Sequence, residues 1–214
     1  MASSGFPLPL RNALAELAIA ALDDDGALQA LSWLAAPDGQ PPAPAAARLT
    51  AAHLIDPGGD ALLDVHAPHG ESVRTHARRA LDAARAYRRT AAPSPEPLTR
   101  GIHQAAALWR ERLFFEVHEV LEALWKTQAG DVRQTLQGVI QIAVAFHHFA
   151  HGNLRGARSL LIEGRARVAG GAAALPALDA TALLAMTAPW EAALTTGSDP
   201  PAEPPPLPLA SPGR

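Results

Sequence analysis

Cysteine is absent from the 214-residue chain, which excludes disulfide bonds, thiolate metal ligands and cysteine nucleophiles. Long apolar runs are absent too: no stretch of about 18 apolar residues occurs that could form a membrane span. The apolar stretch near the N-terminus is interrupted by Glu16, which makes it a poor secretory signal. These absences predict a cytoplasmic protein with no membrane partner.

Charged residues make up only 18% of the chain, and the net charge of −3 gives no general attraction to nucleic acid. Hydrophobic residues reach 48%, enough for one domain with a proper core, alone or with a smaller appendage. We therefore expect a globular protein with no nucleic-acid partner. Small open helical bundles often pair, so a homodimer is a candidate assembly.

Prolines divide the chain. Pro93, Pro95 and Pro97 predict a stiff linker at 93–97, because a residue before proline is pushed out of the α region. From Ser198 onward the tail holds seven prolines and no apolar periodicity, which predicts disorder. The expected parts are a mostly helical region of unknown role (1–92), the linker (93–97), a helical bundle (98–196) and a disordered tail (197–214).

The N-terminal region shows helical spacing of apolar residues in three segments. Between the second and the third, Ala61–Val65 reads as a lone strand or as further helix. The predicted helices are Asn12–Leu22, Ala27–Leu34 and Glu71–Arg89.

The sequence from Thr99 onward predicts an all-α fold, a small antiparallel helical bundle whose short turns force neighbouring helices antiparallel. Thr99 is the expected N-cap of its first helix. Asp131 and Gln134 form an expected capping box, and Asn153 is a further expected N-cap. The remaining helices are expected at Leu113–Gln128, Asp131–His151, Asn153–Gly170, Ala180–Met186 and Pro189–Leu194.

The helix predicted over 113–128 carries carboxylates and an imidazole beside its apolar face. At about 100° per residue, His118 and Glu122 stack at the edge of that face, with Glu119 next to them and Glu116 pointing away. A surface helix usually keeps its carboxylates opposite its aromatic residues. The pattern therefore indicates an inward-facing polar cluster.

The next helix is apolar around most of its circumference, apart from a narrow stripe that includes Gln137, Gln141 and His148. Gly138 flanks the stripe and would let a neighbouring backbone approach closely. We expect this stripe to face the polar cluster of the preceding helix and to bring His148 within side-chain reach of His118.

These helices resemble the bacterial and archaeal domain-of-unknown-function family 309. The similarity covers roughly residues 98–170 and rests on the runs FFEVHEVLEALW (114–125) and LQGVIQIAVAFHHFAHGNLRGARSLL (136–161). The family often has a Phe-Asn-x-Gly turn where this chain has Leu108–Glu111, so the first helix is expected to run straight into the second. The positions that match the family pattern are Glu116, His118, Glu119, Glu122, Trp125, Gln137, Gly138, His148, Gly152 and Asn153.

The resemblance implies an all-α fold and a sometimes-stated assignment as a metal-dependent hydrolase. It does not imply an established activity. No substrate follows from it.

Two interpretations of the cluster stay open, beside that of an ordinary solvated face. In the first, His118, Glu122 and His148 bind a divalent metal ion, with Glu119 as the general base of a hydrolase. Mixed nitrogen and oxygen donors suit zinc, manganese or iron about equally, although HExxE lacks the second His of the zinc-protease motif. In the second, the same side chains form a hydrogen-bond network with Gln137 and Gln141.

The second interpretation makes the protein a non-catalytic helical module without a cofactor. Its polar cluster would then fix the helix register, and the module would bind a partner or a small ligand.

Overall fold

The computed structural model describes residues 6–90 and 94–210, which contain nine α-helices, one short 3₁₀ helix and no β-strand. The all-α fold predicted from the sequence is confirmed. The chain divides into two compact units, with the break between residues 92 and 93. In the described ranges, no helix is long and apolar enough to cross a membrane.

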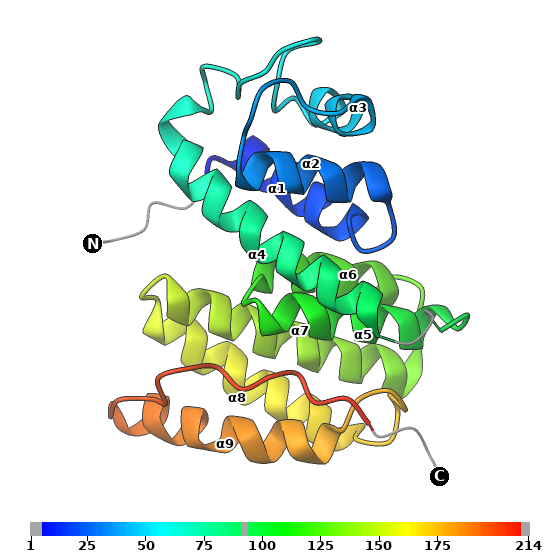
Figure 1. Ribbon diagram of the computed structural model, residues 1–214. Coiled ribbons are helices and arrows are strands. Elements are labelled where there is room, and N and C mark those ends of the chain that lie inside the picture. The colour runs from blue at the N-terminus through cyan, green and yellow to red at the C-terminus, as the bar shows by residue number, and fades with distance from the viewer. Residues whose placement is uncertain (1–5, 91–93, 211–214) are drawn as a thin grey trace. The chain divides into compact units, whose positions relative to one another are not determined.

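The N-terminal unit contains four helices, and α2 packs against the other three (Figure 1). The helix at 43–51 was not predicted, because the prolines at 41, 42 and 44 are typical of a loop. Pro44 lies in the first helical turn, however, where a missing N–H costs nothing. Ala61–Val65 forms bends and turns and is neither strand nor helix. The helices are α1 (Leu8–Ala20), α2 (Asp25–Ala35), α3 (Ala43–Ala51) and α4 (Gly70–Arg89).

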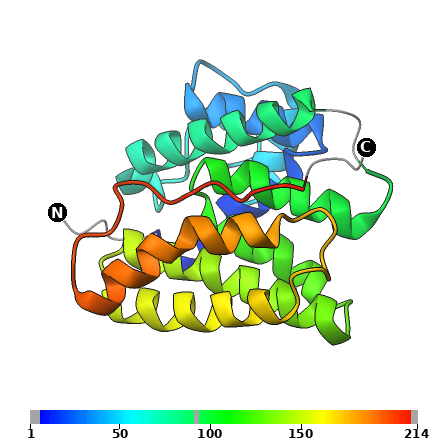
Figure 2. The same ribbon diagram turned by 90° about the horizontal axis from the view of Figure 1, so that it is seen from below.

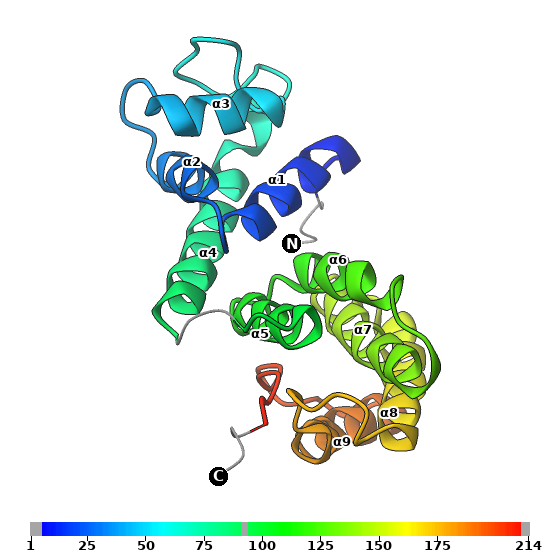
Figure 3. The ribbon, with the colours of Figure 1, turned by 90° about the vertical axis from the view of Figure 1, so that its right-hand side faces the viewer.

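The C-terminal unit is a row of helices in which each packs against the next along the chain. Figure 3 shows the row curved and nearly end-on, with the last helix turned back toward the first. The antiparallel arrangement follows from the short connections. The helices are α5 (Pro97–Arg110), α6 (Phe114–Trp125), α7 (Gly130–Ala150), α8 (Leu154–Gly170) and α9 (Ala180–Thr196).

The helix starts follow the sequence signals only in part. Asn153 caps α8 as predicted, its side chain accepting from the N–H of Gly156 at 2.9 Å. The N-cap of α5 is Glu96, not Thr99, because Pro97 fits the first helical position. The capping box predicted at Asp131 does not form, since α7 begins one residue earlier with no side-chain cap.

The junction of α5 and α6 is a turn, so the expectation of one continuous helix was wrong. Arg112 adopts φ +58°, in the left-handed region. Its N–H donates to the carbonyl of Trp109, and the N–H of Leu113 donates to that of Leu108. These two bonds form a Schellman motif, in which arginine occupies the position usually held by glycine.

An aromatic chain forms the centre of this unit. Phe146 of α7 contacts Trp109 of α5, Phe114 of α6 and Trp190 of α9, with ring centroids 5.0 to 5.8 Å apart. One side chain therefore joins four helices. The contacts with Trp109 and Trp190 are edge-to-face, a geometry that adds to the stabilisation from burial alone.

The two short helices expected after residue 180 are one helix, α9, with Pro189 inside it. Arg165 of α8 donates to the carbonyl of Leu184, to the hydroxyl of Thr187 and to the carboxylate of Glu191. Donors from α8 thus support the turn before the proline, where the helix lacks one of its own backbone donors.

The described part of the tail, 198–210, packs against the bundle, so the disorder predicted there was wrong. Figure 2 shows this segment running alongside α9. Leu207 is only 4% exposed, and Leu209 forms an isolated antiparallel bridge with Leu178. Proline lowers the entropy cost of ordering an extended segment, which composition alone does not reveal.

Candidate metal centre

The geometry of α6 holds three potential metal ligands at the edge of its buried face. Phe114, Val117 and Leu121 are buried. Helical spacing then leaves the side chains of His118, Glu119 and Glu122 half-exposed, at 29%, 41% and 35%. The sequence pattern anticipated this edge position.

These three side chains converge. One ligand atom from each lies within 4.8 Å of the other two. Among the residues that the structure describes, no other group of three or more potential ligands converges in this way. Nδ1 of His118 lies 3.0 Å from Oε1 of Glu119. The three residues are called the α6 cluster below.

The hydrogen bond between His118 and Glu119 defines which ring nitrogen of His118 can bind a metal. An ionised carboxylate only accepts, so Nδ1 carries the proton. The lone pair of the neutral ring then lies on Nε2. A histidine oriented by a carboxylate in this way is a common arrangement among metal ligands.

A cation of the chain already contacts the α6 cluster. Nζ of Lys126 donates to Oε2 of Glu122 at 3.1 Å, in an i,i+4 pair. The lysine side chain is 62% exposed, so the pair is a weak surface interaction. Lys126 was not identified as part of the site from the sequence, although its spacing from Glu122 is the signal for such a pair.

His148, the third ligand predicted from the sequence, is not part of the α6 cluster. Phe114 contacts Phe146 across the antiparallel helices, which sets His118 level with about residue 142 of α7. At the rise of a helix, His148 lies roughly 9 Å farther along the axis. The two histidines were expected to share a site because their stripes were expected to face each other. That expectation did not include the offset between them along the helix axis.

The hydrogen-bond partner of the His148 ring is Asn153. Oδ1 of Asn153 accepts the capping bond from Gly156, which fixes the orientation of the amide. Nδ2 therefore points to His148 and donates to its Nδ1 at 3.1 Å. His148 consequently carries its proton on Nε2 and serves the turn between α7 and α8.

The polar stripe of α7 faces α8, not α6 as predicted. Gln134 accepts from Arg167 at 2.9 Å, and Gln141 donates to Glu163 at 3.1 Å. Gln137, on the same helix, is half-buried. The stripe is therefore a set of links between two helices, separate from the α6 cluster.

Glu116 also departs from the prediction. Helical periodicity placed it pointing away from the apolar face, yet it is only 2% exposed. Periodicity assumes one buried face, and α6 buries a wider arc that includes Val120. Glu116 is thus a buried acid outside the α6 cluster.

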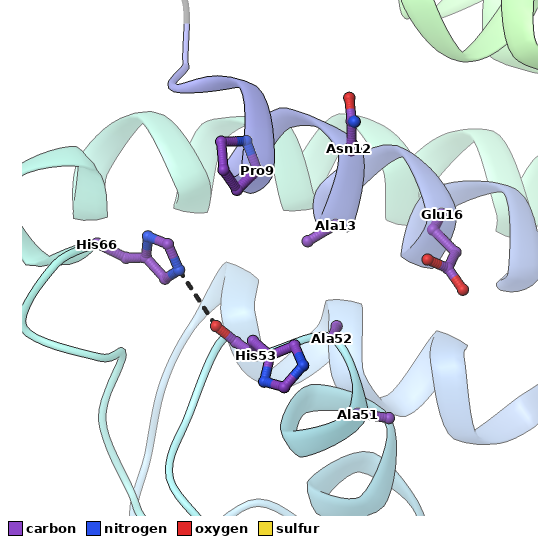
Figure 4. Close-up of a pocket in the computed structure, with 8 residues that line it drawn as sticks. All are labelled: Pro9, Asn12, Ala13, Glu16, Ala51, Ala52, His53 and His66. Carbon is purple, nitrogen blue, oxygen red and sulfur yellow. Dashed lines mark hydrogen bonds between the residues drawn. The ribbon is translucent and has the colours of Figure 1, made fainter.

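The N-terminal unit has a cavity of its own, shown in Figure 4. His66 and His53 meet there, but through Nε2 of His66 and the backbone carbonyl of His53, 3.1 Å apart. His53 has φ +53°, in the left-handed region. The cavity could not be predicted from the sequence, because its residues come from separate segments. They are Pro9, Asn12, Ala13, Glu16, Ala51, Ala52, His53 and His66.

The fold and the α6 cluster define a small all-α protein with a half-exposed His/Glu group on one helix. Residues 102–160 match the family model described as Domain of unknown function (DUF309). This match confirms, for that segment, the family resemblance seen in the sequence. The segment extends from α5 into α8 and contains the whole α6 cluster. No curated protein and no solved structure matches the chain.

Proposed function

We propose that the protein binds a divalent metal ion at the α6 cluster and uses it in a hydrolytic reaction. The observation that supports this is the convergence of His118, Glu119 and Glu122, with ligand atoms within 4.8 Å of one another. The imidazole of His118 and the carboxylate of Glu122 are donors that zinc, manganese and iron accept. His148, named as a ligand from the sequence, has no part in this proposal.

The residues of the cluster differ in their roles. Nε2 of His118 and the carboxylate of Glu122 are the primary ligands. Glu119 holds the His118 ring through Nδ1, and its second oxygen is the proton acceptor for an attacking water. A metal ion bound there supplies Lewis acidity and lowers the pKa of coordinated water.

Half-exposure of the three side chains fits this function, because a substrate must reach the site. It also limits affinity, since both ligands lie on one helix and are not enclosed by other elements. Lys126 must leave Glu122 when a cation binds, and its exposure makes this movement inexpensive. We expect a site that is loaded from solution and that exchanges its metal.

The test is metal binding by calorimetry with Zn²⁺ and Mn²⁺, together with the melting temperature. Wild type should bind one ion and melt higher with added metal by mass action. His118→Ala should lose binding while staying folded, and so should Glu122→Gln. His148→Ala is the matched control and should bind normally. Equal binding by wild type and His118→Ala would refute the proposal.

A second experiment separates metal binding from catalysis. Glu119→Gln keeps a hydrogen-bond acceptor for His118 but cannot take up a proton. It should retain metal and lose most of the turnover of an activated ester or phosphoester, by about 10²-fold or more. Equal turnover in wild type and Glu119→Gln would refute the catalytic role of Glu119, and metal binding would then be the only proposed role of the cluster.

The α7–α8 links favour a structural role for the other polar residues. Gln134 and Gln141 each bond a charged side chain of α8, and both lie on the face that approaches that helix. These bonds fix the register of the two helices. The structural network of the second interpretation therefore describes this stripe, while the metal proposal concerns α6.

A further inference from the structure

The proline-rich tail contacts the bundle in the way that a bound peptide contacts its receptor. Nε1 of Trp109 donates to the carbonyl of Pro205 at 2.7 Å. An indole N–H bonded to a proline carbonyl is suited to polyproline ligands, whose own backbone has few donors to satisfy. Trp109 itself is 1% exposed, so the donor is held rigidly.

Backbone pairing sets the direction and register of the tail. The N–H of Asp179 donates to the carbonyl of Pro208, and the N–H of Ala210 donates to that of Ala177, both at 3.0 Å. Leu209 and Leu178 form the antiparallel bridge between them. Addition of an extended strand through main-chain bonds is a recurring mode of peptide recognition.

Two side chains of the tail complete the contact. Leu207 is 4% exposed and is the apolar anchor between two prolines. Glu203 pairs with Arg112 at 2.7 Å, an exposed interaction that adds orientation more than affinity. Trp109, Arg112 and the segment 177–179 thus form a surface, called the tail site below.

We propose that the tail site is a binding site for proline-rich segments, and that such a segment from another chain exchanges with the resident tail. The occupant it fits has the pattern Pro-Pro-Leu-Pro-Leu of residues 205–209, in an extended conformation. The linked tail has a high effective concentration at its own site. An outside segment therefore binds when the tail is released or when that segment is locally abundant.

The test supplies the tail as a separate molecule. A chain ending at Gly197 is mixed with a fluorescent synthetic peptide of residues 198–214, and binding is followed by anisotropy. Saturable binding with one peptide per chain is expected. A peptide carrying Leu207→Asp and a scrambled peptide should both fail to bind. Trp109→Phe in the protein should weaken binding about fivefold to tenfold, as expected for the loss of one hydrogen bond.

Trp125→Phe is the matched control, because that indole stacks with Arg133 and its Nε1 makes no hydrogen bond to the tail. It should leave peptide binding unchanged. The proposal would be overturned if a folded 1–197 chain does not bind the peptide, or if it binds the scrambled peptide as tightly as the wild-type peptide.

A second format avoids dependence on the folding of the shortened chain. The full chain receives a protease site at residues 198–200 and is cleaved after folding. Excess fluorescent peptide should then replace the cleaved tail, as seen by co-elution with the protein in gel filtration. Failure of the wild-type peptide to exchange more than the Leu207→Asp peptide would likewise overturn the proposal.

Discussion

Gly138 of α7 and Gly164 of α8 let the two helix backbones meet directly. A Cβ atom at either glycine would lie 2.7 Å from the carbonyl oxygen of the other. A backbone oxygen cannot move aside as a flexible side chain can. The Gln134 and Gln141 links to α8 depend on this close approach, because they lie on the same face of α7.

Gly138→Ala should therefore destabilise the protein by about 2–3 kcal/mol, as overpacking does in a tight interior. Gly170→Ala is the control, since a Cβ there would meet open space at the end of α8. It should be neutral or stabilising by up to about 1 kcal/mol, because alanine is the better helix former. Urea denaturation measures both, and equal effects would contradict the close contact.

Lys126→Met should raise the affinity of the α6 cluster for Zn²⁺ several-fold. The substitution removes the ammonium group that contacts Glu122 and competes with the metal ion. Lys126→Arg keeps the positive charge and should bind as wild type does. Calorimetry at one ionic strength gives the comparison, and an affinity lowered by Lys126→Met would mean that the lysine helps to build the site.

Arg112→Gly should stabilise the protein by about 0.5–1 kcal/mol. Glycine adopts the left-handed conformation of this position without steric cost, although the exposed pair with Glu203 is lost. Arg110→Gly is a helical control two residues away and should lose about the same amount. Thermal melting of the two variants should shift in opposite directions.

Glu96→Gln should lower stability at neutral pH by about 0.5–1 kcal/mol, and this deficit should shrink as the pH falls below 4.5. Hydrogen bonds from Thr99 and Leu98 hold the pKa of Glu96 below its ordinary value of 4.5. A lowered folded-state pKa gives stability that is fully present above the unfolded value and is lost as pH falls through the folded one.

Denaturation at several pH values tests this dependence, with Glu16→Gln as a control that caps no helix. A deficit of Glu96→Gln that stays constant as the pH falls from neutrality to well below 4.5 would show that the charge of Glu96 is irrelevant to the cap.

The sequence predicted elements whose signals are local. Apolar periodicity located α4 and α6 to α8, and Asn153 was identified as a cap because its bond to Gly156 is short-range. The edge position of His118 and Glu122 also followed from periodicity within one helix. Fold class and family depended on signals of this kind.

Long-range features were not predictable in the same way. The stripe of Gln134 and Gln141 was assigned to the wrong neighbour, because periodicity shows that a face is buried and not which helix covers it. His148 was misplaced for a related reason, since antiparallel order does not fix the axial register. The docking of the tail includes a bond from Trp109 to Pro205, 96 residues away, and the composition of the tail does not indicate such a contact.

The three bonds from Arg165 have a consequence for the order of folding. α9 contains Pro189 and so lacks one internal backbone donor, and its preceding turn is supported by a guanidinium that belongs to α8. The carbonyl of Leu184 gains this donor only once α8 has folded and holds Arg165 beside α9. α9 is therefore a helix conditional on its neighbour. As a free peptide it should be largely unstructured, and it should gain helicity late, when it docks onto a preformed α8.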